Sequence, residues 1–466
     1  MKLWLLALAV TIAAVVALMS AQTGQRRVSL VVTNGIVVTM DAGNRVLQNG
    51  AVAIEGSDIV AVDTAEAIAR GFRGRETIDA TGHIVLPGLI NTHTHAPMVL
   101  YRGLADDLAL MEWLEKYIFP AEARTVSPEF VRAGTRLAAL EMIQSGTTTF
   151  TDMYYFEEEI AQETRSAGLR GVLGQTVIQF PVADAKTPAD ALSRAEAFIT
   201  RFKGDPLITP AVAPHAMYTL DGPTLRAARE LSRRHGVPTL IHLAETEAEL
   251  ATSQAQHKMS PVAYLDSLGF LGAGVVGAHA VWVTEPEIAL LKSRGVGLSH
   301  TPESNMKLAS GTAPVPAYLR ADVALGLGTD GAASNNDLDM FEAMRTASLL
   351  HKLQTKDPRA VSARAALEMA TIRGARALGM ERQIGSLEVG KRADLIAVSV
   401  VGARQTPMYD PLSHLVYVAH GDDVRTSVVH GKVLMRNRRV ATLNEARVLA
   451  EAHEWAAKVR VAVNRD

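Results

Sequence analysis

Eight short apolar runs recur between residues 84 and 331, and they lead into polar or metal-liganding residues. The runs are IVLPGLINTHTHA, TTTFTDM, GVLGQTVIQ, ITPAVAPHA, PTLIHLAE, VVGAHAVWV, GVGLSHTP and ALGLGTDG. Segments with helical periodicity separate most of them, and this alternation predicts an α/β fold, a (β/α)8 TIM-type barrel over residues 84–384. In such barrels the chemistry takes place at the carboxyl ends of the strands, where these polar residues fall.

Histidines and acids close most of these runs. His93 and His95 close the first run, Asp152 the second, His215 the fourth, His242 with Glu245 the fifth, His279 the sixth, His300 the seventh and Asp330 the eighth. His93 and His95 are two residues apart on a strand, so their side chains share one face. Such a pair also occurs by chance, but His242 and Asp330 extend it to four candidate ligands on three strand ends. Imidazoles and a carboxylate suit zinc, so we expect a metal site with an open position for water.

Strand patterns return at both ends of the chain. The segment 28–79 has hairpin signals at Asn34-Gly35 and in the turn 41–44, and later strands are expected at 393–400, 415–420 and 426–435. We therefore expect residues 28–83 and 385–440 to form one small β-domain, a β-sandwich built from both chain ends. Residues 441–466 are expected to form a C-terminal helix, because their apolar positions recur at helical spacing.

The first 21 residues carry a targeting signal. Lys2 precedes an apolar stretch from Leu3 to Met19, and small and polar residues follow it. A bilayer-spanning helix needs about 20 apolar residues, so the stretch is short for one. Only Thr11 interrupts it, which leaves no polar face for an amphipathic core helix. We expect export to the periplasm by a signal peptide, with a retained membrane anchor as the alternative.

The overall composition narrows the class of partner. The chain has 466 residues, 48% of them hydrophobic, which is enough for a barrel with a large core and a further domain. A formal net charge of −2 favours neither nucleic acid nor an anionic membrane as a partner. The absence of cysteine excludes disulfides, thiolate ligands and a cysteine nucleophile. No nucleic-acid partner is therefore expected, and a homo-oligomer is compatible with the sequence.

Four long motifs give the chain a family resemblance: PGLINTHTHAPMVLYRGLADDL, HLAETEAE, SHTPESNMKL and GTDGAASNNDLDMFEAMR. Over essentially its whole mature length the chain resembles the amidohydrolase superfamily and, within it, the zinc-dependent 5′-methylthioadenosine/S-adenosylhomocysteine deaminases. The resemblance implies deamination of an adenosine-type purine and one divalent metal, usually zinc, held by His93, His95, His242 and Asp330. Binuclear members carry a carboxylated lysine at the end of the fourth strand, whereas the nearest lysine here, Lys203, precedes that strand.

The resemblance also implies catalytic roles. Zinc lowers the pKa of bound water toward ~7, so hydroxide can attack the carbon that bears the exocyclic amine. Glu245 would carry a proton to the ring nitrogen and then to ammonia; the alternative is an ordinary capping or first-turn acid of the next helix. Asp330 would accept the proton of the water, and His279 would orient the attacking oxygen.

The residues implied to bind substrate are Glu122, His215, Glu245, Trp113, Ser334 and His300. Glu122 would bind the ribose hydroxyls. Trp113 either lines the pocket or belongs to an ordinary helix core, and His300 either contacts the base or supports another residue. One position departs from the family pattern: where close relatives place an arginine that grips the homocysteine carboxylate, this chain has Gln175.

A glutamine offers no charge-assisted fork to a carboxylate. We therefore expect methylthioadenosine or adenosine to be preferred over S-adenosylhomocysteine, unless Arg194 or Arg201 takes the place of the missing arginine.

Two other functions stay open on the sequence. The same scaffold could hydrolyse another amino- or chloro-substituted heterocycle, such as guanine, a pterin or a triazine. Retention of both Glu245 and Asp330 favours proton-shuttled deamination over dehalogenation. The remote alternative is a non-catalytic zinc-dependent ligand-binding protein. The presence of every catalytic residue argues against this alternative.

Overall fold

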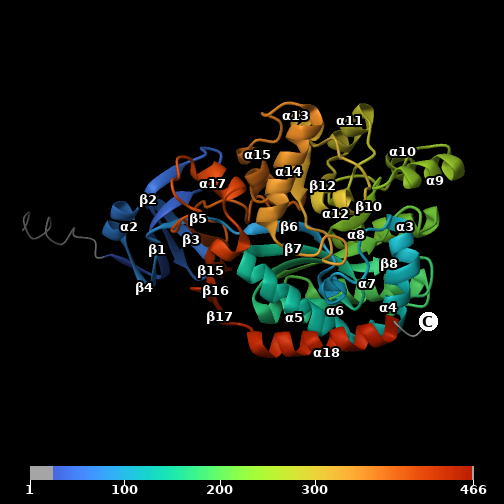
Figure 1. The fold of residues 1–466 in the computed structure, drawn as a ribbon, viewed down its shortest axis with the longest axis horizontal. Coiled ribbons are helices and arrows are strands. Elements are labelled where there is room, and N and C mark those ends of the chain that lie inside the picture. Colours follow the sequence, from blue (N-terminus) through green and yellow to red (C-terminus); the bar gives the residue numbers. More distant parts are fainter. Residues whose placement is uncertain (1–24, 464–466) are drawn as a thin grey trace, which may run out of the picture.

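A closed barrel and a neighbouring β-domain make up the computed structural model, which describes residues 25–463 (Figure 1). The barrel strands are β6 (Leu89–Thr94), β7 (Thr147–Tyr154), β8 (Arg170–Val177), β9 (Ile208–Pro214), β10 (Thr239–Leu243), β11 (Val275–His279), β12 (Gly297–His300) and β13 (Ala324–Leu327). They pair in chain order, all parallel, and β13 closes the ring against β6. The predicted (β/α)8 barrel is confirmed.

Helices connect the barrel strands and form the outer layer. They are η1 (Ala96–Tyr101), α3 (Leu110–Trp113), η2 (Leu114–Ile118), α4 (Phe119–Thr125), α5 (Pro128–Ser145), α6 (Glu157–Ala167), α7 (Pro188–Phe202), α8 (Gly222–His235), α9 (Glu247–His257), α10 (Pro261–Ser267), α11 (Glu285–Arg294), α12 (Pro302–Lys307), α13 (Val315–Arg320), α14 (Met340–Thr355), α15 (Ala363–Met369) and α16 (Ile372–Ala377). The sequence sets several starts: Ser127, Thr187 and Asp221 each accept a backbone N–H of the first turn of α5, α7 or α8. Each of these first turns contains a proline, which has no N–H to leave unpaired there.

The amino end of the barrel is filled by side chains. Ile90 and Leu240, near the starts of their strands, pack with Met380 and Ile384 from the segment after α16. The backbone N–H of Ile90 also donates to the carbonyl of Ala370 at 2.8 Å. A functional site is therefore expected at the opposite, carboxyl end.

Both ends of the chain build the β-domain. Its elements are β1 (Arg26–Val38), β2 (Val46–Glu55), β3 (Asp58–Thr64), α2 (Ala65–Gly71), β4 (Phe72–Asp79), β5 (His83–Pro87), β14 (Leu395–Ser399), α17 (Pro411–Tyr417), η3 (Gly421–Asp423), β15 (Val424–Val429), β16 (Lys432–Arg436) and β17 (Arg439–Val440). The nine strands belong to one sheet in the order β17-β16-β15-β14-β5-β1-β2-β3, with β4 paired to β1. The antiparallel pairing of β5 with β14 joins the two ends of the chain, as the sequence predicted.

The junction between the two domains lies at Gly88. The first apolar run was expected to be one barrel strand, but it splits into β5 in the β-domain and β6 in the barrel. A side chain at Gly88 would not fit, because an added Cβ would lie 2.1 Å from Oγ1 of Thr148. Its backbone N–H donates to the carbonyl of Asp394 at 3.0 Å, which fixes the crossing to the β-domain.

Two local predictions about the β-domain are wrong. The segment 415–420 was expected to be a strand, but its first half ends α17 and no residue of it lies in a strand. Asp410 caps this helix by accepting the N–H of Leu412, and a proline follows the cap. Asn34-Gly35 was expected to turn a hairpin. Instead, β1 continues through it with an irregular register, and Asn34 has a φ of 65°. A single left-handed residue here makes a bulge and not a chain reversal.

A buried ion pair joins the barrel to the β-domain. Nε of Arg170, on β8, donates to Oδ2 of Asp394 at 2.9 Å, and Nη2 approaches Oδ1 at 3.3 Å. Both side chains are 3% exposed. Nη1 of Arg170 donates to the carbonyl of Pro206, and Oδ1 of Asp394 accepts the N–H of His430. The two charges are thus satisfied from both domains.

The last helix, α18 (Glu445–Val463), lies along α5 and α4 at the bottom of Figure 1. Trp455 packs edge-on against Phe130 with ring centroids 5.4 Å apart, and Glu451 pairs with Arg136 at 2.7 Å. The predicted C-terminal helix therefore docks on the barrel. The expected signal segment, residues 1–21, lies outside the described residues. Within residues 25–463 no helix has the length and apolarity needed to cross a membrane.

Candidate active site

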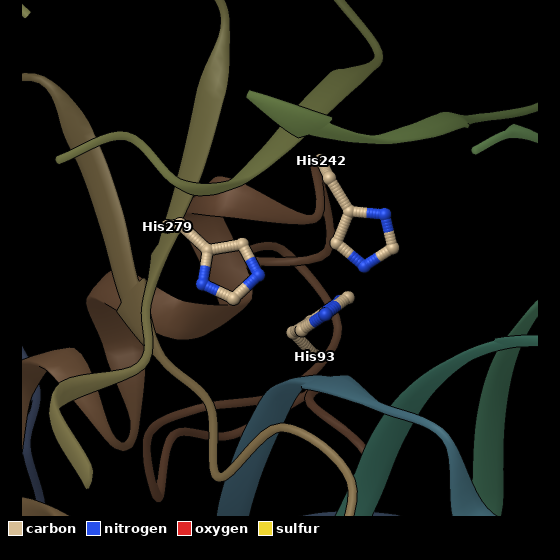
Figure 2. Close-up of side chains that lie close together, drawn as sticks. All are labelled: His93, His242 and His279. Atoms are coloured by element: carbon tan, nitrogen blue, oxygen red, sulfur yellow. The ribbon is translucent and has the colours of Figure 1, made fainter. Parts of the chain in front are cut away.

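Imidazole and carboxylate groups converge at the carboxyl end of the barrel. Nε2 of His93 and Nε2 of His95 each lie 3.4 Å from Oδ1 of Asp330, and Nε2 of His242 lies 3.3 Å from Nε2 of His95. His93 also groups with His242 and His279, with donor atoms within 4.8 Å of one another. Figure 2 shows these three rings turned toward a common centre from three strands. The four residues predicted as ligands therefore lie together, with His279 beside them.

The hydrogen bonds of these imidazoles suit a cation. Nδ1 of His95 is 2.7 Å from the carbonyl of Met153, and Nδ1 of His242 is 2.8 Å from the carbonyl of His215. A carbonyl only accepts, so each Nδ1 carries the hydrogen and, in a neutral ring, each Nε2 presents a lone pair. Burial lowers the pKa of His93 to about 4 and that of His242 well below its usual value. Nε2 of His93 is buried without a hydrogen bond, so the residues fit a divalent metal.

Asp330 is oriented by its neighbours. Its Oδ2 accepts hydrogen bonds from Ser304 at 2.7 Å and from Ser334 at 3.0 Å. Burial alone would raise its pKa, but the adjacent His93 and His95 outweigh burial and hold the pKa well below its usual value. Its φ of 65° is a strained backbone conformation for a residue with a side chain, of the kind that functional sites retain. Oδ1 consequently points at the imidazoles as a carboxylate.

Glu245 and His279 face each other beside the donor cluster. Oε2 of Glu245 is 3.8 Å from Nε2 of His279, and Oε1 accepts a hydrogen bond from Ser310 at 3.1 Å. Nδ1 of His279 lies 2.9 Å from Oδ1 of Asn305, which leaves Nε2 toward Glu245. The carboxylate of Glu249 accepts the backbone N–H of Glu245 at 2.8 Å. Helix α9 begins two residues after Glu245, so Glu245 is neither its cap nor in its first turn.

The cluster opens into a cavity at the carboxyl end of the barrel. Of the residues expected to bind substrate, those that line it are Glu122, His215, Glu245, Trp113 and Ser334. The hydroxyl of Tyr154 donates to Oε1 of Glu122 at 2.6 Å, and burial raises the pKa of Glu122 to about 7. Trp113 is 6% exposed and packs in the core as well, so both interpretations of it hold.

His300 does not line this cavity, so its expected substrate contact is not realised. Its Nε2 lies 3.1 Å from Nε2 of His351, on α14, and both side chains are buried. The structure favours the second alternative for His300, in which it supports another residue and does not contact the base. Ser334, in contrast, both lines the cavity and holds Asp330.

Gln175 is also turned away from the cavity, contrary to the expectation that it faces the substrate. It is fully buried, and its amide donates to Oδ2 of Asp184 at 2.8 Å. Arg194 cannot replace the missing arginine, because it pairs with Glu158 at 2.5 Å and lies 3.5 Å from Asp184. Arg201 lies over the ring of Phe202 on the outside of α7. Among residues 25–463, no lysine or arginine lines the cavity.

Several supporting residues escaped the sequence reasoning. Glu249, Asn305 and Ser310 hold the catalytic side chains or the backbone that carries them, and Tyr154 holds Glu122. Asp152, which closes the second run, is fully buried and accepts the N–H of Ala96 instead of facing the cavity. Glu249 and Asn305 lie inside the motifs HLAETEAE and SHTPESNMKL, so the motifs were the available signal.

A parallel eight-stranded barrel with imidazole and carboxylate donors at its carboxyl rim defines the class of metal-dependent barrel hydrolases. The chain belongs to the amidohydrolase family, which matches residues 84–434. It is therefore a hydrolase that acts on C–N bonds, as the motifs predicted.

Named relatives cover almost the whole chain. The chain is 48% identical over 437 residues to the 5-methylthioadenosine/S-adenosylhomocysteine deaminase of Syntrophobacter fumaroxidans, covering 94% of this chain and 100% of that protein. It is 44% identical over 439 residues to the 5′-deoxyadenosine deaminase of Methanosarcina mazei, with 93% and 99% covered. The zinc-bound structure of an adenosine deaminase from Xanthomonas campestris is similar with a TM-score of 0.92 at 40% identity, with 94% and 100% covered.

Proposed function

We propose that the protein is a zinc-dependent hydrolytic deaminase of adenosine-type nucleosides, which replaces the exocyclic amine of the purine by oxygen and releases ammonia. The observation that carries this proposal is the convergence of His93, His95, His242 and Asp330 beside Glu245 in one cavity. The names of the relatives support the substrate class, because all three denote deamination of an adenosine-type nucleoside.

Each of the catalytic side chains has a defined task in this proposal. His93, His95, His242 and Asp330 would hold a divalent cation, which would supply a water of lowered pKa, ~7 for zinc. Glu245 accepts one proton of that water at Oε2 and donates it to the ring nitrogen beside the carbon under attack. Asp330 takes the second proton of the water, and Glu245 passes it on to the departing amine, which leaves as ammonia. His279 presents Nε2 toward Glu245, because Asn305 holds its Nδ1, and it orients the attacking oxygen.

The cavity wall supplies the nucleoside contacts. The hydroxyl of Tyr154 occupies Oε1 of Glu122, so Oε2 remains for the ribose hydroxyls. His215, whose pKa burial lowers to about 3, is a neutral ring that can accept a hydrogen bond from the ligand. Trp113 offers an aromatic wall to the nucleoside.

An ammonia-release screen tests the proposal. Zinc-loaded protein is incubated with adenosine, 5′-methylthioadenosine, guanine and a chlorotriazine, and ammonia, chloride and the organic product are measured. We expect one ammonia per inosine-type product from both nucleosides and no chloride. Turnover of guanine or the triazine in the absence of nucleoside turnover would overturn the proposal in favour of another heterocycle.

We also propose that the chain is exported, on the strength of the apolar stretch within residues 1–21. Fractionation of cells that express the full chain, followed by N-terminal sequencing, tests this. A mature protein that starts close after Ala21 supports cleavage, and an intact N-terminus in the membrane fraction supports an anchor. An intact chain in the cytoplasm contradicts export.

A further inference from the structure

Asp152, on β7, binds the chain on both sides of the metal ligand His95. The hydroxyl of Thr94 donates to Oδ1 of Asp152 at 2.9 Å, and the backbone N–H of Ala96 donates to the same oxygen. The carbonyl of the next residue, Met153, accepts the Nδ1–H of His95 at 2.7 Å. Two consecutive residues of β7 therefore fix the backbone before and after His95 and the direction of its ring.

The backbone at His95 lies where regular strand pairing ends. The ladder between β6 and β7 is irregular from Asn91 to Thr94, and β6 ends at Thr94. His95 is the cap residue of η1, and its side chain makes no capping hydrogen bond. The first N–H of a helix has no partner within the helix, so Asp152 supplies to Ala96 the acceptor that the cap residue does not.

A second buried acid lies beside Asp152. Glu157 is the first residue of α6, and its Oε1 accepts the backbone N–H of Tyr154 at 2.9 Å. The carboxyl groups of Asp152 and Glu157 are fully buried and lie within hydrogen-bond reach of each other. Oδ2 of Asp152 and Oε2 of Glu157 receive no hydrogen bond from an N–H or O–H group elsewhere in residues 25–463.

These two free oxygens need a proton between them. Two ionised carboxylates only accept hydrogen bonds and repel each other, whereas one shared proton gives both oxygens a partner. Burial, together with the charge of Asp152, raises the pKa of Glu157 well above its usual value, which assigns the proton to Glu157. Asp152 then remains the carboxylate whose Oδ1 accepts the two hydrogen bonds beside His95.

We propose that Asp152 and Glu157 share one proton and act as a positioning pair. The pair holds His95 toward the cation on one side and Tyr154 in the cavity wall on the other. The hydroxyl of Tyr154 in turn donates to Glu122, so the pair connects the metal ligands to the residue proposed to bind ribose. This inference rests on the proposed metal site and adds to it a support that touches neither the metal nor the substrate.

Amide substitutions test the shared proton, because a carboxamide carries its own hydrogens. In Asp152→Asn the new amide can donate to Glu157 while Oδ1 remains an acceptor, and in Glu157→Gln the new amide can donate to Asp152. Each single variant should therefore bind zinc within about threefold of the wild type, since one hydrogen bond replaces another. In infrared difference spectra, both variants should lose the C=O stretch of one protonated carboxyl group. A band that persists in Asp152→Asn would overturn the shared proton.

Removal of the acceptor tests the link to the metal. Asp152→Ala leaves Thr94 and Ala96 without their shared partner. Zinc affinity, measured by competition with a chromophoric chelator, should fall about 10–100-fold, the usual effect of losing a group that supports a metal ligand. Thr94→Val removes one of the two hydrogen bonds and keeps the carboxyl pair, so it should bind zinc more weakly than the wild type and retain the infrared band. This second variant decides the question if Asp152→Ala does not fold.

Asp394→Asn is the matched control for a purely structural loss. It changes a buried carboxylate that is bonded to Arg170 and His430, so it should lower the free energy of unfolding and leave zinc affinity unchanged. Unchanged zinc affinity in Asp152→Ala or in Thr94→Val, or a loss in the control as large as theirs, would overturn the positioning role. A wild type that binds no zinc would reject the proposed function, whereas the infrared result depends on the carboxyl pair alone.

Discussion

Replacing Glu245 by glutamine isolates the proton transfer from metal binding and from packing. The amide has the size of the carboxyl group, and Ser310 and Glu249, which hold the side chain and its backbone, are unchanged in the variant. Glu245 belongs to neither group of converging metal donors, so the metal should stay. The variant therefore keeps the site assembled and removes the group that carries the proton.

The expected loss follows from that role. A positioned general acid or base contributes about 10²–10⁴-fold, so kcat of Glu245→Gln should fall by at least about 10², or roughly 3 kcal/mol in the barrier. KM should change little, because the cavity wall is intact. Ser310→Ala is the graded comparison: it removes one hydrogen bond to the carboxylate and leaves the carboxylate present, so its kcat should lie between those of the variant and the wild type.

Steady-state ammonia release with 5′-methylthioadenosine measures both parameters, and elemental analysis of the same samples gives the metal content. Thermal melting checks that both variants are folded. A Glu245→Gln protein with full metal and a kcat within about tenfold of wild type would contradict the assigned proton transfer, since a positioned acid–base residue is worth more than that. Loss of metal in proportion to loss of activity would instead make Glu245 a ligand.

Three further outcomes are expected. Chelation should lower the melting temperature, because removal of the cation leaves imidazole lone pairs facing each other, and zinc should restore it at one metal per chain. Calorimetry measures the melting temperature and elemental analysis the metal content. Two metals per active chain would be inconsistent with a single site. Asp394→Asn should lower the free energy of unfolding, measured by urea denaturation, by about 3–5 kcal/mol, because it leaves the charge of Arg170 buried without a partner. As the control, Glu66→Gln in an exposed ion pair should lower it by under about 1 kcal/mol. Similar losses in the two variants would refute the distinction between buried and exposed pairs. Burial raises the folded-state pKa of Glu122 to about 7 from 4.5, so its ionisation removes stability as the pH rises from 4.5 through 7. The free energy of unfolding of Glu122→Gln should therefore gain up to about 3 kcal/mol relative to wild type between pH 5 and pH 8. A pH-independent difference between their melting curves would rule this out.

Periodicity and motif position predicted the barrel and the strand ends that carry His93, His242 and Asp330. These features depend on chain-local patterns: a buried parallel strand is continuously apolar, and its carboxyl end must leave the barrel through polar residues. The C-terminal helix followed from its spacing in the same way. The strand predicted at 415–420 failed because its apolar letters are shared by buried helices and strands, and the capping Asp410 before Pro411 decided between them.

The direction of individual side chains was beyond the sequence. Neighbouring residues on a strand point to opposite faces, so the cavity-lining Thr176 means that Gln175 points away from the cavity. A one-residue difference in register inverts such an assignment, and no local pattern in the β8 run sets that register. His300 and its partner His351 are 51 residues apart in the chain, and only the tertiary fold, which sets α14 against the barrel, brings them together.

The pairing of β5 with β14 has a consequence for how the chain is made. Residues 83–87 leave the ribosome roughly 300 residues ahead of 395–399, which is a delay of about 15–60 s at common rates of translation. The barrel has all eight strands once residue 327 has emerged, while the edge of β5 still has its backbone N–H and C=O groups unpaired. The sheet of the β-domain can therefore close only after both ends of the chain have been made. A nascent chain that stalls after Ile384 and before Leu395 would hold a filled barrel beside an open sheet edge, which could pair with another copy.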